Sequence, residues 1–250
     1  MRGLLLLIGF MVGNVCFAQE QDAPEIKVRS KAGDLYAEIL NRTDRVISEH
    51  DRGTNAHENI HMINSYYSNK TRGKRRAFYI AGEGKVFYSD KPALLKSDVV
   101  KFVPQSVRGN RYNLYIKGSP SWNDTPTYIM DEWVAYIGGA MVAVEDHYKG
   151  TNKDNSDRVC GPLEFSVYSI ALCMAIEEKD NKFWNEKKEF RDFVYKMLLK
   201  SHQVYHRGKD VEAFRSSSQG RILNNLRTSE DCSRMRVFMK KWFNGVWLED

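Results

Sequence analysis

Cysteine and proline are scarce in this chain, with four and six residues among 250, and no Cys-x-x-Cys pair occurs. The missing pair argues against a thioredoxin-like redox centre and against a zinc ribbon. Neither sign of charge dominates, because 38 lysines and arginines are interspersed with 32 aspartates and glutamates. Together with 42% hydrophobic residues, this excludes a largely disordered, collagen-like, low-complexity or coiled-coil protein. The chain is long and apolar enough to bury a core of its own.

Long apolar runs are absent except at the N-terminus. Arg2 precedes an apolar stretch that starts at Leu4, and the small residue Ala18 ends it. This pattern is typical of a secretory signal peptide over residues 1–18. The stretch is shorter than the roughly 20 apolar residues that span a bilayer, so a retained anchor is a less favoured alternative, as is lipidation at Cys16. We expect no permanent membrane span and a mature chain that is secreted or periplasmic.

A strong basic patch is also missing. The net charge is +6, and basic residues gather only at 70–76, 187–188 and 240–241, where acids or turn residues interrupt them. Short clusters of this kind are usually solvated faces. We therefore expect no nucleic-acid partner, and an anionic envelope surface is the electrostatic contact that better fits an exported chain.

The mature chain keeps an odd number of cysteines, namely Cys160, Cys173 and Cys232. At most one disulfide can form among them, and if one forms we expect Cys160 to pair with Cys232. Cys173 lies inside the apolar run 165–176 and is predicted to be a buried free thiol.

Local patterns predict one α+β domain over residues 19–250, with a small sheet in its N-terminal third and a helical C-terminal half. The clearest strand signal is a hairpin, in which Gly82-Glu83-Gly84 separates two aromatic and β-branched runs at 77–88. Such a hairpin can offer an edge strand to an extended peptide, or simply complete the sheet. Other expected elements are a strand at 25–31, a helix at 34–47 and a strand at 111–118.

Two predicted helices matter most for function. The helix at 54–69 shows a 3.6-residue apolar period and should begin with Thr54 or Asn55 as its N-cap. The helix at 127–148 is apolar on most sides, which predicts that it is buried. It also contains the small residues 138–140, and glycine in a helix is costly unless another backbone approaches closely. Close packing of this helix against a neighbour is therefore expected.

The most specific motif is His57-Glu58-Asn59-Ile60-His61, an H-E-x-x-H match within the first of these helices. Four residues make about one helical turn, so both histidines project from the same face and can bind one metal ion. Glu58 is placed to act on a metal-bound water rather than on the metal itself. The motif predicts two zinc ligands and a general base, the alternative being two surface histidines on an ordinary helix.

A catalytic zinc site needs a third protein ligand and an open position. Six residues after His61, where a metzincin would have its third histidine, the chain has Tyr67. Glu132 is the favoured candidate, because an ionised carboxylate inside a mainly apolar helix is costly unless a cation pairs with it. The alternatives are a helix-start carboxylate near the N-terminal dipole and a histidine ligand from elsewhere, namely His147, His202 or His206.

This combination resembles the gluzincin metallopeptidases, in which H-E-x-x-H on one helix and a glutamate on a later helix hold the zinc. It is loosely similar to the anthrax lethal factor and Pro-Pro endopeptidase group through Glu132-Trp133-Val134-Ala135. A thermolysin-like pattern has an aspartate four residues after the ligand glutamate, and the chain has Tyr136 at that position. The resemblance covers 54–69 and 127–148 and implies a zincin-like fold.

The resemblance also implies a site and an activity. Zn²⁺ would be held by His57, His61 and Glu132, and Glu58 would be the general base for hydrolysis of a peptide or protein substrate. An oxyanion needs a further donor. Tyr128 and Tyr136 lie one helical turn before and one turn after Glu132, so either phenol is a candidate for that role, although each can equally be a packing residue.

Two rival hypotheses remain open at this stage. The chain could be a non-catalytic binding module of the envelope, with a fortuitous motif or a structural zinc closed by a fourth ligand such as His50 or His147. It could also hydrolyse an amide other than a peptide bond, for example in the cell wall. An open coordination position beside Glu58 would favour an enzyme over a binding module.

Overall fold

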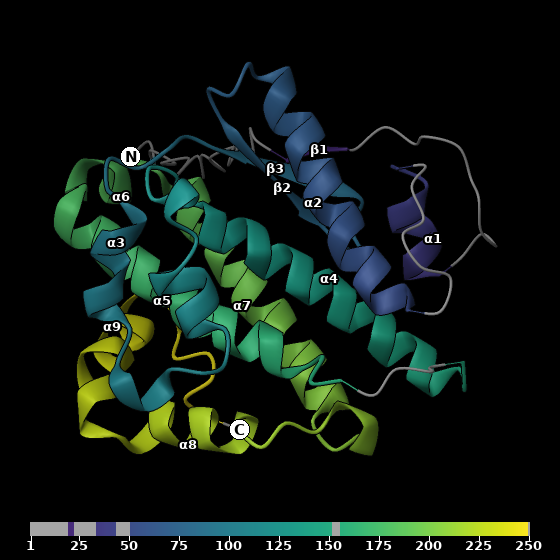
Figure 1. Ribbon diagram of the computed structural model, residues 1–250. Coiled ribbons are helices and arrows are strands. Elements are labelled where there is room, and N and C mark those ends of the chain that lie inside the picture. Colours follow the sequence, from purple (N-terminus) through teal and green to yellow (C-terminus); the bar gives the residue numbers. More distant parts are fainter. Residues whose placement is uncertain (1–19, 23–33, 44–50, 152–155, 250) are drawn as a thin grey trace, which may run out of the picture.

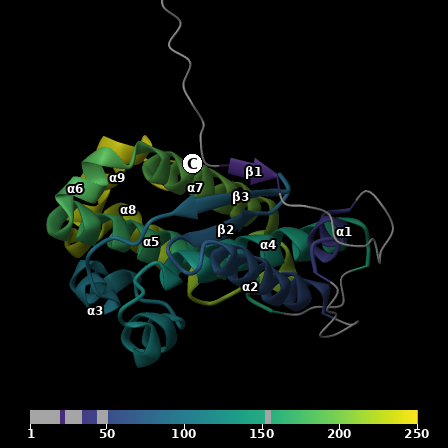
Figure 2. The same ribbon diagram turned by 90° about the horizontal axis from the view of Figure 1, so that it is seen from above.

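Helices predominate in this computed structural model, which describes residues 20–22, 34–43, 51–151 and 156–249. A small antiparallel sheet packs on them in the N-terminal third of the chain (Figures 1 and 2), as expected for the α+β class. The regular elements are β1 (Glu20–Asp22), α1 (Leu35–Leu40), α2 (Arg52–Lys70), β2 (Arg76–Ile80), β3 (Lys85–Ser89), α3 (Lys96–Val99), α4 (Tyr128–Tyr148), α5 (Cys160–Lys179), α6 (Asn181–Glu186), α7 (Lys188–Gly208), α8 (Gln219–Thr228) and α9 (Ser233–Phe243). The predicted signal peptide and the strand expected at 25–31 lie outside the described residues.

The sheet has the strand order β1-β3-β2, with antiparallel pairing throughout. The predicted hairpin is confirmed: Gly82 and Gly84 both have positive φ, which glycine adopts without the steric cost of a side chain. Along the β2 edge, the Ala77 N–H donates to Ser68 Oγ at 2.9 Å and the Tyr79 N–H to Asn64 Oδ1 at 2.7 Å. Helix α2 therefore occupies these two edge donors, so they are not open to a peptide strand.

Helix α2 begins earlier than predicted. Its N-cap is Asp51, whose carboxylate accepts from the Thr54 N–H at 2.8 Å, so the expected caps Thr54 and Asn55 both lie inside the helix. Aspartate is a strong N-cap, but the glycine at position 53 makes this segment resemble a turn. A side chain at Gly53 would place its Cβ 3.2 Å from Gly139 O of α4, so the glycine permits a tight contact between the two helices. Tertiary packing, rather than local propensity, extends the helix.

The segment expected as a strand at 111–118 is instead a π-helical turn, Tyr112–Lys117. Tyr112 and Ile116 are both buried, and their spacing of four residues is the helical signal within an apparently alternating run. The buried ammonium of Lys96 donates to the carbonyls of Tyr115 at 3.0 Å and Ile116 at 3.1 Å, and also to that of Gly118. This remote cation satisfies carbonyls that the end of the helix leaves free.

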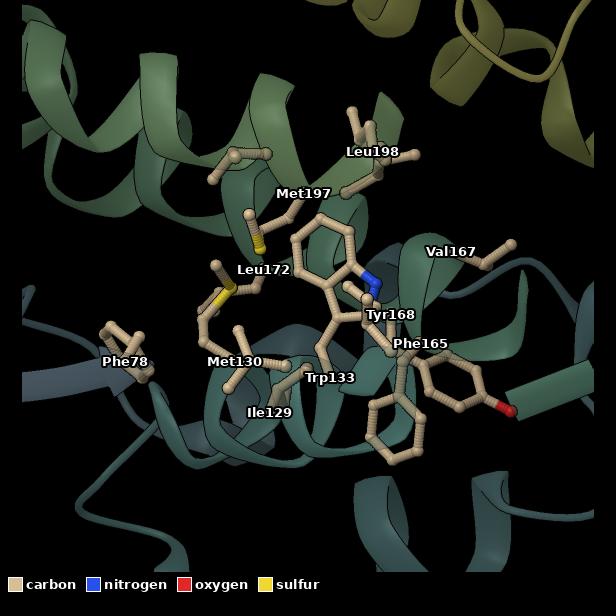
Figure 3. Packing of buried hydrophobic residues seen from close by; sticks show 14 of the residues in the cluster. Phe78, Ile129, Met130, Trp133, Phe165, Val167, Tyr168, Leu172, Met197 and Leu198 are labelled. Carbon is tan, nitrogen blue, oxygen red and sulfur yellow. The ribbon is translucent and has the colours of Figure 1, made fainter. Parts of the chain in front are cut away.

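The core lies between α4, α5 and α7 (Figure 3). Trp133 of α4 is fully buried there, near Met197 and Leu198 of α7, and its indole N–H donates to Ser201 Oγ at 2.9 Å. A buried tryptophan contributes several kcal/mol to stability, on the order of 3–5 when truncated to alanine. Because Trp133 directly follows Glu132, this packing fixes the position of the carboxylate that the sequence singles out.

Helix α5 is the most buried long helix of the core. By length and composition alone it could cross a membrane, and it is the single helix of the described residues that meets that test. The other elements cover it, however, and 94% of its apolar stretch is buried inside the fold. This is the environment of a core helix in a globular protein.

The favoured disulfide does not form, because Cys160, Cys173 and Cys232 are all free and buried. Cys160 Sγ lies 3.6 Å from Ser218 Oγ, whereas Cys232 Sγ lies 3.5 Å from Ser106 Oγ. The two thiols that were expected to pair thus belong to separate polar clusters. Burial, with the charge of Glu164 nearby, raises the pKa of Cys160 to about 11, which makes it a poor nucleophile for oxidation. Cys173 is the buried free thiol that the sequence predicts.

Candidate metal centre

Two helices bring the three predicted ligands together. His57 and His61 project from α2 with their Nε2 atoms 3.1 Å apart, and Glu132 of α4 places Oε2 3.6 Å from the first and 3.5 Å from the second. Ligands in tetrahedral positions around zinc, each about 2.05 Å from the metal, lie about 3.4 Å from one another. The triangle of ligand atoms therefore has the size of one face of a zinc tetrahedron, and these three residues could hold a metal ion.

The charges at this triangle fit a cation. Glu132 is buried, and its Oε2 has no hydrogen-bond partner among the residues that the structure describes, although it faces both imidazoles. Burial, together with the charge on His61, holds the pKa of His57 well below its usual range. Burial also acts to lower the pKa of His61, but the carboxylates of Asp131 and Glu132 outweigh it and raise that pKa to about 10. A single proton cannot satisfy three converging lone pairs, whereas one metal ion can.

A further carboxylate orients His61. Asp131 Oδ2 accepts from His61 Nδ1 at 2.9 Å, and Asp131 Oδ1 accepts from the Asn64 side-chain amide at 2.6 Å. When a metal ion displaces the proton of Nε2, the proton that remains on Nδ1 leaves the Nε2 lone pair directed at the triangle, the arrangement by which outer carboxylates fix metal-binding histidines. Through Asn64, which also accepts from the Tyr79 N–H, the sheet is connected to the centre. Asp131 and Asn64 were not predicted from the sequence, although a signal was present: Asp131 directly precedes Glu132, and Asn64 lies three residues after His61.

Glycines allow the two helices to approach, as the sequence predicts. Helix α2 lies along α4 (Figure 1), and a side chain at Gly139 would come within 2.8 Å of Gly53 O and 3.3 Å of His57 Cβ. The carbonyl belongs to a helix backbone and cannot move without displacing α2. Close backbone contact therefore sets the distance between the histidine pair and Glu132.

Gly139→Ala should lower the free energy of unfolding by about 1–3 kcal/mol, the usual cost of overpacking a tight interface. Because α2 must shift away from α4, the affinity for Zn²⁺ should fall as well. Thermal melting and a zinc competition assay would measure both effects. Gly220→Ala is the matched control, because nothing lies within 4 Å of that helical position, so it should leave stability unchanged or raise it. Equal stability of the two variants would contradict this role for Gly139.

Glu58 lines a cavity of about 360 Å³ on one side of the triangle. The same cavity is bordered by His61, Glu132 and Tyr128, one of the two predicted oxyanion donors. Burial and the neighbouring carboxylate of Glu132 raise the pKa of Tyr128 above its ordinary value, so the phenol keeps its proton. The cavity thus combines a carboxylate base, a hydroxyl donor and two of the three ligand residues.

Tyr136, the other predicted donor, lies on a different side of the centre. Its ring packs edge-on against His57 with centroids 4.6 Å apart, and its hydroxyl is 3.2 Å from that of Tyr115. A second cavity of about 170 Å³ is bordered by Tyr136, His57 and Arg111. Arg111 is already committed to Glu164 and Asp157, each at 2.8 Å. Tyr136 therefore holds the His57 ring in place and is less well placed than Tyr128 to act beside Glu58.

The alternative histidines lie elsewhere in the fold. His147 packs against Phe214, and His202 lies between His206, whose ring is tilted against it, and Trp247. Within the part of the chain that the structure describes, the group of potential ligands has three members and no fourth. His50, the other suggested fourth ligand, lies outside the described residues.

Comparisons of the chain with protein-family models, curated proteins and solved structures find no match. The resemblance to gluzincins therefore stays a prediction that depends on the residues of α2 and α4. What the structure adds is that Glu132, chosen from sequence, lies within ligand distance of both histidines.

Proposed function

We propose that the chain is an exported zinc-dependent peptidase of gluzincin type, which hydrolyses peptide bonds of peptide or protein substrates outside the cytoplasm. The observation that carries the proposal is the convergence of His57 Nε2, His61 Nε2 and Glu132 Oε2 next to a cavity that contains Glu58. Two imidazoles and one carboxylate suit zinc, and three protein ligands are typical of catalytic rather than structural zinc sites. This ligand count favours an enzyme over the envelope binding module.

Zinc in such a site lowers the pKa of water and polarises the carbonyl of a substrate. Glu58 accepts the proton of the attacking water and then passes it to the leaving amine, so that one carboxylate is both base and acid. Tyr128 keeps its proton and donates a hydrogen bond to the oxygen on which negative charge develops. Asp131 keeps His61 in the tautomer that leaves Nε2 free.

A peptide-hydrolysis assay tests the proposal. The purified chain without residues 1–18, loaded with Zn²⁺, would be incubated with a mixture of synthetic peptides, and new termini would be identified by mass spectrometry. We expect cleavage that is lost with a chelator and restored by Zn²⁺. Absence of cleavage by protein that holds one zinc per chain would favour the binding module.

Asp131→Asn should weaken zinc binding about 10- to 100-fold, the usual effect of removing the carboxylate behind a ligand histidine. At saturating zinc the variant should still hold one ion, because the three ligands remain. Chelator competition measures the affinity. Asp146→Asn is the control, since Asp146 is a buried carboxylate of the same helix that pairs with Arg52, 3.1 Å away. If both variants bind zinc like the wild type, Asp131 has no part in the centre.

A further inference from the structure

The larger cavity follows α2 away from the metal centre. It is bordered on this helix by Glu58, His61 and Ser65, and then by Ser68 and Asn69. Glu58, His61, Ser65 and Ser68 are three or four residues apart, and Asn69 lies four residues after Ser65, so these positions form one stripe along the helix. From His61 to Ser68 the helix rises about 10 Å. The cavity is therefore long enough to hold several residues of an extended chain beside the centre.

Arg76 borders the end of the cavity away from Glu58. It is the first residue of β2, and the adjacent Ala77 N–H is anchored on Ser68. The Nε atom of Arg76 is buried without a hydrogen-bond partner, and no ion pair joins this arginine to any residue that the structure describes. The neighbouring Arg75 differs, because it faces Asp90 at 3.5 Å. A guanidinium group that borders a cavity and has no carboxylate partner among the described residues is suited to bind the carboxylate of a ligand.

Aromatic rings hold Arg76 over the cavity. Its guanidinium carbon lies 5.9 Å from the centre of the Trp122 ring, and Trp122 stacks on Tyr128 with centroids 4.7 Å apart and planes within 5°. Tyr128 in turn borders the metal centre. The stack thus runs from the proposed oxyanion donor to the arginine, and it limits the orientations that the guanidinium can adopt.

The charge changes sign along the cavity. The carboxylates that border it, those of Glu58, Asp131 and Glu132, all lie at the metal end. At the other end lies Arg76, and the chain just before it carries the exposed residues Lys70, at the end of α2, and Arg72 and Lys74, in the turn that leads to β2. An anionic segment would be attracted to this end. In the absence of the metal, the carboxylates at the other end would repel it.

We infer that Arg76 is a specificity-determining residue that binds an acidic side chain of the peptide substrate. This inference depends on the proposed function for the position of the cleaved bond. An extended chain advances about 3.4 Å per residue, so a distance of about 10 Å along α2 places the acidic residue about three positions from that bond. Substrates are therefore acidic peptides, with aspartate or glutamate at that distance.

Hydrolysis of matched peptides tests the inference. Peptides identified in the library assay would be made with Asp, Asn or Lys at each position within four residues of the cleaved bond. For the wild type we expect kcat/KM to be at least about tenfold higher for Asp than for Asn at one of these positions, in line with a charge-assisted hydrogen bond. Arg76→Gln should abolish this preference, and Arg76→Glu should reverse it toward Lys. Lys182→Gln, which removes an exposed charge of α6 outside the cavity, should keep it.

A binding assay separates this inference from the proposed function. Zinc-loaded Glu58→Gln protein would be titrated with two pools of fluorescent decapeptides. One pool contains Asp and Glu, and the other has Asn and Gln at the same positions. Tighter binding of the acidic pool, lost in the double variant with Arg76→Gln, would support the inference even if the wild type hydrolyses nothing. The inference would be overturned if the wild type hydrolyses peptides without any charge preference and Arg76→Gln, in protein that melts like the wild type, does not change this hydrolysis. The peptidase proposal would then remain intact.

Discussion

Replacing Glu58 with glutamine should reduce peptide hydrolysis by about 10²- to 10⁴-fold, the usual contribution of a general base, while the protein still binds one zinc ion. The amide has nearly the same shape as the carboxylate but cannot accept the proton of the attacking water. Glu58 borders the cavity beside His61 and Glu132 but does not belong to the triangle of ligand atoms. The measurements are kcat with a cleaved peptide and zinc content by elemental analysis.

Glu178→Gln is the control for this experiment. Glu178 lies near the end of α5, where it pairs with Lys101 and Arg234 at the surface, so its replacement should not change kcat. If Glu58→Gln loses its zinc, this carboxylate is a ligand rather than a base. If it hydrolyses peptides at the wild-type rate, the base lies elsewhere.

Replacing Glu132 with glutamine should weaken zinc binding by at least about 100-fold, more than the loss of an outer carboxylate does. Hydrolysis should fall together with the bound zinc. At neutral pH the metal-free variant should be no more stable than the metal-free wild type, because Glu132 helps to raise the pKa of His61 to about 10 and the amide does not. Chelator competition gives the affinity, and thermal melting of the metal-free proteins gives the stability.

The amount of bound zinc thus distinguishes the roles of the two glutamates. Glu58→Gln should keep zinc and lose hydrolysis, whereas Glu132→Gln should lose both at limiting zinc. If Glu132→Gln binds zinc as tightly as the wild type, the third ligand is not this carboxylate, and the resemblance to gluzincins fails even though the histidine pair can still bind metal.

The group of residues that could hold a metal ion could be predicted from sequence because its signals are local. His57 and His61 are one helical turn apart, which fixes their common face, and Glu132 is conspicuous as a carboxylate in an apolar helix. Gly139 likewise marks a close helix contact, and the structure confirms this contact with Gly53. In each case a residue type is costly at its position unless a specific partner compensates for it.

The features that the sequence did not reveal depend on long-range contacts. The segment 111–118, expected as a strand, is a π-helical turn whose last carbonyls accept from the buried ammonium of Lys96, 19 to 22 residues earlier in the chain. Asp131 orients His61 only because α2 and α4 pack together. The order of residues does not show such partners, so the carboxylate of Asp131 beside His61 and the lack of an ion pair at Arg76 among the described residues became apparent only in three dimensions.

The most direct test of the account is a zinc titration of the metal-stripped chain, followed by removal of free metal and elemental analysis. The wild type should retain one zinc ion per chain, and the double variant His57→Ala, His61→Ala should retain none while it remains folded by circular dichroism. A wild-type chain that binds no zinc in the presence of excess metal, or a double variant that binds as much as the wild type, would contradict the assignment of the centre.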